Sequence, residues 1–233
     1  MKKFALALAV LAIFGMTLTS YLYANKEGKK HKEIDLPIER PKPKDIPEEE
    51  EDGDDPTFYG EEIDSETDSM VYVIDESCSM YGSRIAKAKA ELVKSVQALT
   101  KNFKFSIVAY SCNVRVWQNK LVEATAQNKS AAVGWSASIQ PTGATNTSGG
   151  VARALQIDTK NKLVVLLTDG APNCMSASGY GSGSSSSHLS KIISSNAQKA
   201  KIDVFAIQPW SGSYKKFCQD IAQKSGGKYR EVN

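Results

Sequence analysis

The sequence predicts an α/β fold in which helices cover both faces of one central β-sheet. Short apolar runs alternate with helical patterns from about residue 65 to the end of the 233-residue chain, and this alternation is typical of α/β sheets. The run 161–170 contains Leu-Val-Val-Leu-Leu, a stretch of the kind found in strands that are buried on both faces. Polar side chains follow the two most apolar runs, where such folds bind their ligands.

The first two predicted elements are a strand and a helix. Residues 70–75 form a short apolar run, which predicts a buried strand. In residues 83–101 the apolar side chains recur at helical spacing on one face, which predicts an amphipathic helix. The runs 104–111 and 113–118 predict a β-hairpin, which gives the sheet one antiparallel edge strand. The later elements are predicted as helices at 128–139 and 147–157 (capped by Thr147 or Ser148), a strand at 161–170, a helix at 187–201, a strand at 202–209, a helix at 213–227 and a strand at 228–232.

Residues 1–24 are predicted to be either a secretory signal peptide or an N-terminal membrane anchor. Lys2 and Lys3 precede an apolar run at 4–24 that ends in Ala24, and this order is typical of a signal peptide. The same run is about long enough to span a bilayer and tether the chain. Both alternatives predict an exported protein, either periplasmic, extracellular or anchored facing outward.

Residues 25–66 are predicted to be a charged, disordered linker before a folded domain at 67–233. The segment contains five prolines, the acidic block 48–52 and few apolar residues, so burial cannot offset the entropy of ordering it. Residues 25–64 carry 7 basic and 15 acidic side chains, a net charge of −8, whereas 65–233 carry 20 and 11, a net charge of +9. The basic domain either has an ordinary solvated surface or prefers anionic partners, the linker included. No pattern indicates nucleic-acid binding.

The four cysteines fit an oxidising compartment better than a zinc site. The chain has no Cys-x-x-Cys motif and only two histidines. From the expected order of the strands we predict disulfides Cys78–Cys112 and Cys174–Cys218. The alternative is that one or more of the four remain buried thiols.

Oxygen-bearing side chains are expected to gather at the carboxyl edge of the sheet. Asp75, Ser77 and Ser79 follow the first strand, Asp169 follows the most apolar strand, and Thr145 lies in a Gly-containing loop that leads into a helix. Hydroxyl and carboxylate oxygens are hard donors that suit Mg²⁺, Mn²⁺ or Ca²⁺. We therefore predict that these five residues bind a divalent cation, with Mg²⁺ the first choice.

These segments resemble the von Willebrand factor type A (VWA) domain with its metal-ion-dependent adhesion site (MIDAS). The resemblance covers about 68–233. The family's Asp-x-Ser-x-Ser motif corresponds to 75–79, its loop threonine to Thr145, its strand-end aspartate to Asp169 and its closing Gly-Gly-x-Tyr to 226–229. The three site segments occur in the right order and each follows the right element, which makes the resemblance specific.

The resemblance implies a doubly wound, mostly parallel, Rossmann-like sheet with a divalent cation at its carboxyl edge. In the family the serines and the threonine can ligate the cation directly, and the aspartates act directly or through water. The open coordination position takes an Asp or Glu carboxylate from a partner protein, because a cation held by few acids keeps excess positive charge. Glu76 and Cys78 depart from the family pattern, and we expect Glu76 to point away from the site.

The expected function is a metal-dependent protein-binding module for adhesion or assembly. The alternative is a structural scaffold of an envelope or surface complex, in which the metal mainly stabilises the fold. No enzymatic activity is expected: a phosphatase motif needs a second aspartate at Ser77, and a serine hydrolase needs a base, for which only His188 in the Ser-rich region is available. Gly-x-Ser-x-Gly and P-loop motifs do not occur. A bland alternative for Ser77 or Ser79 is that it caps the helix beginning near Ser83.

Overall fold

The computed structural model describes residues 57–62, 68–170, 172–175 and 183–233. The predicted signal peptide or anchor, the predicted linker as far as residue 56 and most of the Ser-rich loop at 176–187 lie outside the described residues. None of the helices in the described part of the chain combines the length and the apolar character needed to cross a membrane.

One seven-stranded sheet organises the described residues, with the strand order β5-β4-β3-β7-β8-β9 and β6 also paired to β4. Adjacent strands in the series β4-β3-β7-β8-β9 are parallel, whereas β5 and β6 run antiparallel to β4. The predicted mostly parallel α/β sheet with an antiparallel hairpin at its edge is confirmed. The strands are β3 (Ser69–Asp75), β4 (Lys104–Tyr110), β5 (Val114–Val116), β6 (Val122–Glu123), β7 (Leu163–Thr168), β8 (Lys201–Ile207) and β9 (Tyr229–Val232).

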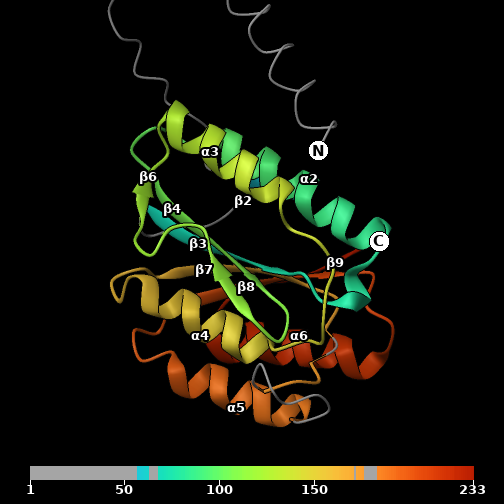
Figure 1. Ribbon diagram of the computed structural model, residues 1–233. Helices are drawn as coiled ribbons and strands as arrows, with labels where there is room; N and C mark the ends of the chain where they lie inside the picture. The colour runs from blue at the N-terminus through green and yellow to red at the C-terminus, as the bar shows by residue number, and fades with distance from the viewer. Residues whose placement is uncertain (1–56, 63–67, 171, 176–182) are drawn as a thin grey trace, which may run out of the picture. The chain divides into compact units, whose positions relative to one another are not determined.

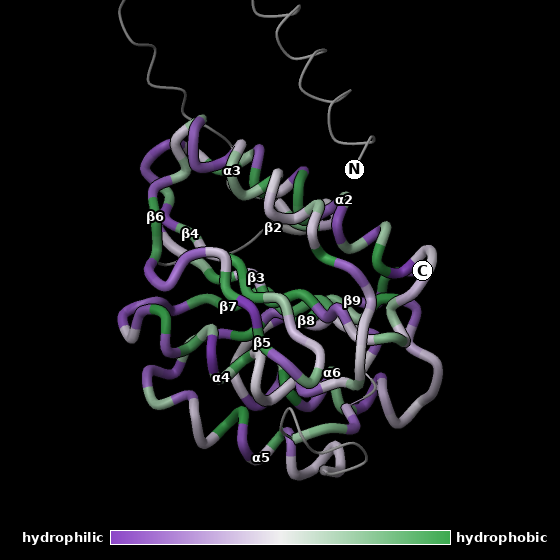
Figure 2. Tube along the Cα trace, viewed as in Figure 1, coloured by the Kyte–Doolittle hydropathy of each residue, from purple (hydrophilic) through white to green (hydrophobic). Residues whose placement is uncertain are grey.

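Helices cover both faces of this sheet, with α2 and α3 on one face and α4, α5 and α6 on the other (Figure 1). Alternate residues of β3 enter two different cores: Tyr72 packs with the α2 side and Val73 with the α4–α6 side. Figure 2 shows the apolar strands in the centre of the fold, where both faces of β3 and β7 are buried. The helical elements are η1 (Cys78–Met80), α2 (Ser83–Ala98), α3 (Ala126–Ala137), α4 (Thr147–Ile157), α5 (Ser185–Ser195) and α6 (Gly212–Ser225).

A short β-hairpin precedes the sheet and corrects the predicted domain boundary. Strands β1 (Thr57–Phe58) and β2 (Glu61–Glu62) pair antiparallel within the segment predicted to be linker. The Phe58 side chain is fully buried, and its ring lies 4.8 Å from that of Phe205 between centroids. The linker prediction is therefore wrong for residues 57–62, because one aromatic side chain that reaches the core outweighs the acidic composition around it.

The N-cap of α4 also differs from its prediction. The helix begins at Thr147, as expected, but the cap is Asn146, whose side-chain oxygen accepts a hydrogen bond from the amide of Gly149 at 2.9 Å. Thr147 and Ser148 lie inside the first turn and are buried. An asparagine is as good a cap as serine or threonine, and Thr145 lies one position before this cap.

Candidate functional site

The loop 141–146 lies at the carboxyl edge of the sheet and binds the segment that follows β3. The amide of Thr142 donates to the carbonyl of Glu76 at 2.7 Å, and the amide of Cys78 donates to the carbonyl of Gly143 at 3.0 Å. These backbone bonds fix the position of the loop relative to the turn that carries Ser77 and Ser79. The loop that contains Thr145 is therefore positioned by main-chain contacts, which do not depend on the Thr145 side chain.

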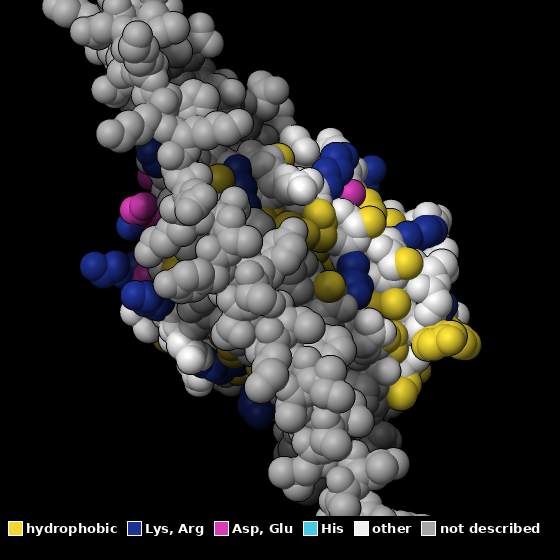
Figure 3. All heavy atoms as spheres, turned by 45° about the horizontal axis from the view of Figure 1, so that its top comes forward, with side chains coloured by type: hydrophobic (Ala, Val, Ile, Leu, Met, Phe, Trp, Pro, Cys, Tyr) yellow, Lys and Arg dark blue, Asp and Glu magenta, His cyan; other side chains and the backbone are white. Residues whose placement is uncertain are grey.

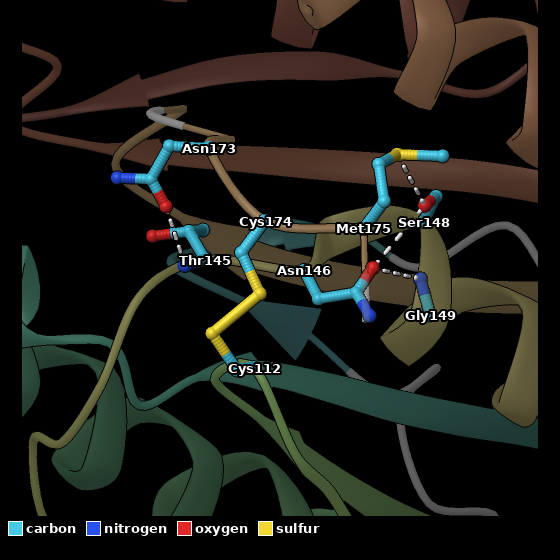
Figure 4. Close-up of a disulfide and its surroundings, with 8 residues drawn as sticks. All are labelled: Cys112, Thr145, Asn146, Ser148, Gly149, Asn173, Cys174 and Met175. Carbon is cyan, nitrogen blue, oxygen red and sulfur yellow. Dashed lines mark hydrogen bonds between the residues drawn. A yellow bond between two sulfur atoms is a disulfide. The ribbon is translucent and has the colours of Figure 1, made fainter. Parts of the chain in front are cut away.

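The same loop binds the segment that follows β7 (Figure 4). The carbonyl of Thr145 accepts hydrogen bonds from the amides of Asn173 at 3.0 Å and Cys174 at 3.2 Å. In return, the amide of Thr145 donates to Oδ1 of Asn173 at 2.8 Å. The three segments predicted to form a site are thus joined at one edge, where the parallel strands β3 and β7 both end.

Three hydrogen bonds hold the carboxylate of Asp75. This carboxylate is completely buried, and Oδ1 accepts a hydrogen bond from the amide of Ser77 at 2.8 Å. Oδ2 accepts from the Thr168 hydroxyl at 2.7 Å and from the Tyr110 hydroxyl at 3.2 Å. Donors from β4, β7 and the following turn therefore hold both oxygens of this carboxylate in place.

Two buried carboxylates meet at this edge. Asp169, immediately after β7, is as fully buried as Asp75. Burial, and secondarily the negative charge of Asp169, raise the pKa of Asp75 from its ordinary value of 3.8 to about 7. Close to neutral pH the protein thus holds negative charge in a buried region of low dielectric constant, which costs free energy. A bound cation would reduce this cost.

The serine hydroxyls face each other and do not cap a helix. The Oγ atoms of Ser77 and Ser79 lie 3.0 Å apart. Ser77 precedes η1 without a side-chain cap hydrogen bond, and α2 is preceded by Gly82, which has no capping side chain. The alternative that Ser77 or Ser79 caps the helix beginning near Ser83 is therefore wrong, and the two hydroxyls form a hydrogen bond with each other instead.

Glu76 is engaged by a residue from the edge hairpin. Its buried carboxylate accepts hydrogen bonds from Nε and Nη2 of Arg115 at 3.0 and 2.6 Å, a bidentate ion pair. The Arg115 guanidinium also lies 5.3 Å from the centre of the Trp135 ring. Both carboxylate oxygens of Glu76 thus bind Arg115 of β5, and Glu76 adds no free carboxylate to the candidate site.

Replacing Arg115 with methionine is expected to destabilise the protein by about 1–3 kcal/mol, because it leaves the Glu76 carboxylate buried and unpaired. The side chain of Arg115 is 40% exposed and that of Glu76 only 3%, so water reduces the loss only in part. Urea unfolding measures the effect. The double variant Glu76→Gln/Arg115→Met should recover part of the loss, and equal stabilities of the single and double variants would contradict the account.

The structure corrects both predicted disulfides. Cys112 is bonded to Cys174, whereas Cys78 is an exposed thiol and Cys218 a buried one (Figure 4). The prediction paired cysteines that follow neighbouring strands. It failed because the loop 141–146 crosses above β3 and draws the segments after β4 and β7 together.

Contacts of the loop show how this happens. The amide of Asn146 donates to the carbonyl of Ser111 at 2.8 Å, while the carbonyl of Thr145 accepts from the amide of Cys174 at 3.2 Å. Two adjacent loop residues therefore bind the residue before Cys112 and Cys174 itself. Cys218, on α6, lies instead beneath Gly170, at which an added Cβ would approach its Sγ to 3.0 Å.

The residues that support Asp75 are not among those predicted from the sequence. Tyr110 and Thr168 end β4 and β7, the two strands that flank β3, and a polar side chain at the end of an apolar strand is the signal that could have identified them. The ring of Tyr110 also fills the space beside Gly150 on α4, at which an added Cβ would meet the ring at 2.6 Å. The close packing of α4 against β4 thus fixes the Tyr110 ring, and the Tyr110 hydroxyl donates the hydrogen bond that helps to hold Asp75.

His188, the only histidine that sequence analysis considered as a base, lies within the first turn of α5 and is buried. Its Nδ1 accepts a hydrogen bond from the amide of Ser148 at 3.2 Å, and burial, followed by the positive charge of Lys191, lowers its pKa to about 4. The Nδ1 lone pair is therefore occupied by the N-terminus of α4 instead of facing a serine hydroxyl.

Comparisons with known proteins give a consistent family relationship. The sequence model of a family described as von Willebrand factor type A domain matches residues 68–231. Inter alpha-trypsin inhibitor, heavy chain 4 of Mus musculus and inter-alpha-trypsin inhibitor heavy chain H4 of Homo sapiens are 31% and 32% identical to this chain over 126 residues. These matches cover 49% of this chain but only 13% and 14% of the relatives, so the chain spans a small part of their length.

Solved structures share the fold at low sequence identity. A von Willebrand factor type A protein from Catenulispora acidiphila has a TM-score of 0.58 at 22% identity, covering 71% of this chain and 38% of that one. The pilus adhesin SpaC of Lactobacillus rhamnosus GG has a TM-score of 0.58 at 17% identity, covering 71% and 28%. The PilB minor pilin of Streptococcus sanguinis has a TM-score of 0.53 at 15% identity, covering 74% and 58%.

Proposed function

This chain belongs to the von Willebrand factor type A domain family, and on that premise we propose that it is a protein-binding module that acts through a divalent cation. The cation site is the candidate site: Asp75, Ser77, Ser79, Thr145 and Asp169. The observation that carries the proposal is the joining of two buried carboxylates and two facing serine hydroxyls at one edge of the sheet. Mg²⁺ is the cation that this set of hard oxygen donors fits best.

The donor set supports a cation that is only partly neutralised. Asp75 and Asp169 supply two negative charges at most, and the other donors are neutral hydroxyls. Glu76, the acid that could have added a third charge, is held by Arg115. A bound divalent cation with an open coordination position would therefore attract a carboxylate oxygen from a partner protein.

Hydrogen bonds within the protein hold the candidate ligand residues in place. Tyr110 and Thr168 orient the Asp75 carboxylate by hydrogen bonds, and the amide of Ser77 holds its other oxygen. Asn173 fixes the backbone of Thr145. Such support keeps a site in binding geometry before its ligand arrives and reduces the entropy lost on binding.

The relatives favour adhesion or assembly outside the cytoplasm. Structural neighbours include a pilus adhesin and a minor pilin, and the N-terminal residues 1–24 have the pattern of an export signal or anchor. We infer that the chain is exported and meets its partner in the envelope or at the cell surface. A scaffold role, in which the cation mainly stabilises the fold, is the second candidate and is favoured by the relief of charge between Asp75 and Asp169.

A pull-down from envelope extract distinguishes the two candidates. The immobilised full chain is expected to retain its partner in Mg²⁺ and to release it in excess chelator, and Asp75→Ala should retain none while keeping its fold by circular dichroism. Retention of the same partner by the chelated protein and by Asp75→Ala would support the scaffold instead. Glu76→Gln is the matched control, because it changes an adjacent acid that is not part of the proposed site.

Affinity for Mg²⁺ is expected to rise with pH and to level off above about pH 7. Below that value the proton on Asp75, whose pKa is raised to about 7, must be displaced before a cation binds. The apparent affinity should therefore fall by up to about tenfold for each unit below pH 7. Calorimetric titrations at several pH values measure this slope, and an affinity that is independent of pH between about 5 and 8 would contradict it.

A further inference from the structure

Two large aromatic side chains project into solvent near the candidate site. Tyr81 is 81% exposed and Trp210 is 66% exposed, and they are the large hydrophobic side chains that stand out as exposed among the described residues. Tyr81 directly follows η1 and is two residues after Ser79, and Trp210 lies in the loop between β8 and α6. Since β3, β7 and β8 are parallel neighbours, both aromatics lie at the edge that carries Asp75 and Asp169.

One arginine joins the two segments that carry these aromatics. Nη1 of Arg84 donates to the carbonyl of Ser79 at 3.2 Å, and Nε donates to the carbonyl of Gln208 at 3.2 Å. Its guanidinium lies 4.6 Å from the centre of the Trp210 ring, a cation–π contact. The indole is therefore held against a residue that is itself fixed by two backbone carbonyls, although most of its surface remains in water.

The loop that carries Trp210 is held in an unusual backbone conformation. Gln208 has a φ of 45°, in the left-handed region that residues other than glycine rarely adopt. Its amide donates to the carbonyl of Val232 at 2.7 Å, and its side-chain oxygen accepts from the Ser83 hydroxyl at 3.2 Å. The protein thus sustains local strain, together with one backbone and one side-chain hydrogen bond, in the loop that presents an aromatic ring to solvent.

We propose that Tyr81 and Trp210, the latter held by Arg84, form an aromatic rim that selects the partner of the candidate cation site. The rim receives an apolar side chain that is adjacent to the acidic residue in a segment of the partner protein. The inference rests on the proposed function, because it assumes that the acidic residue itself binds at the cation. Figure 3 shows hydrophobic side chains gathered on one side of the visible face, interspersed with Lys and Arg.

Charge and residue type identify this partner chemistry. The segment 65–233 has a net charge of +9, Arg84 adds a local positive charge beside Trp210, and Glu76, the acid next to Asp75, is paired with Arg115. These charges favour an acidic segment over a basic one. Tryptophan, tyrosine and arginine are the residues most enriched among those that dominate protein-binding energy, and their rings need an apolar surface to cover.

Immobilised synthetic peptides test the rim without knowledge of the natural partner. The probes are Gly-Leu-Asp-Leu-Gly, Gly-Gly-Asp-Gly-Gly and the neutral Gly-Leu-Asn-Leu-Gly, each displayed at high density and exposed to the full chain in Mn²⁺. Wild-type protein is expected to bind the leucine-flanked aspartate at least about tenfold better than either other peptide. Tyr81→Ser/Trp210→Ser should bind the two aspartate peptides equally, and the exposed α5 variant Lys191→Ser should behave as wild type.

Failure of the rim and failure of the cation site give different results. Mn²⁺ binding by the rim variant, measured by calorimetry, should stay within about twofold of wild type, whereas Asp75→Asn should lose Mn²⁺ and peptide together. If the rim variant keeps the preference for leucine, or if wild type shows no preference, the rim proposal is overturned and the cation site stands. If chelator or Asp75→Asn leaves peptide binding unchanged, the proposed function itself is overturned.

Discussion

Replacing Asp75 with asparagine is expected to stabilise the metal-free protein above pH 7 and to abolish its stabilisation by Mg²⁺. In the folded protein burial and Asp169 raise the pKa of Asp75 to about 7, so the folded state binds more protons than the unfolded state between about pH 4 and 7. Stability must then fall as the pH rises through that window. The full effect is up to about 4 kcal/mol, and asparagine, which does not ionise, avoids it.

Thermal unfolding of both proteins, with and without Mg²⁺, measures these two effects. Saturating Mg²⁺ should stabilise wild type by about 2.7 kcal/mol at a concentration of about one hundred times the dissociation constant, and Asp75→Asn by much less. The amide can keep the bond from Ser77, while the hydroxyls of Tyr110 and Thr168 can rotate to accept. An asparagine variant that is less stable than metal-free wild type near pH 8, or that responds equally to Mg²⁺, would contradict the account.

Removing the disulfide through Cys112→Ser/Cys174→Ser is expected to cost about 4 kcal/mol of stability. The bond joins residues 62 apart in the chain, and the entropy that such a cross-link removes from the unfolded state has about this value. Because Thr145 binds the backbone of Cys174, the variant should also bind Mg²⁺ more weakly. Guanidinium unfolding and calorimetry measure the two losses.

Cys78, which lies outside the disulfide, provides the control for this experiment. Cys78→Ser changes an exposed thiol and is expected to alter stability by less than about 0.5 kcal/mol. Under the pairing that the sequence suggested, Cys78→Ser would instead break a bond and be as costly as Cys112→Ser. Equal losses in these two single variants would therefore contradict the disulfide described here.

Local sequence patterns predicted the sheet and the order of its elements. The apolar runs that became β3 and β7 are long enough, and free enough of charge, to be recognisable as central strands. Helix α4 begins and ends at the predicted residues. The location of Asp75 and Asp169 at one edge was predictable from the same patterns, because parallel strands bring their carboxyl ends to one edge.

Contacts between distant segments could not be predicted in the same way. The disulfide depends on the loop 141–146, which binds the segments that follow β3, β4 and β7. The sequence of any one of these segments does not indicate that contact. Phe58 is buried although the segment around it is acidic, so average composition gave the wrong boundary. Tyr110 contacts Asp75 only because β4 pairs with β3 in a register that sets these two residues opposite each other.

The same limit applies to the pairing of Glu76 with Arg115. Sequence analysis identified the acid as a departure from the family pattern and expected it to point away, but its partner comes from the edge hairpin 39 residues later. Charge patterns along the chain do not reveal such a pair, because the turn between β4 and β5 decides which side chains of the hairpin reach the site.

The most direct test of the central claim is a titration of Mn²⁺ into the full chain at about pH 8, followed by electron paramagnetic resonance of the free ion. The account predicts one tightly bound ion per chain for wild type and for Glu76→Gln, whose acid is committed to Arg115. It predicts that this ion is lost in Asp75→Asn and in Asp169→Asn. No bound ion in wild type, or the same bound ion in all four proteins, would contradict the claim that these residues form a cation site.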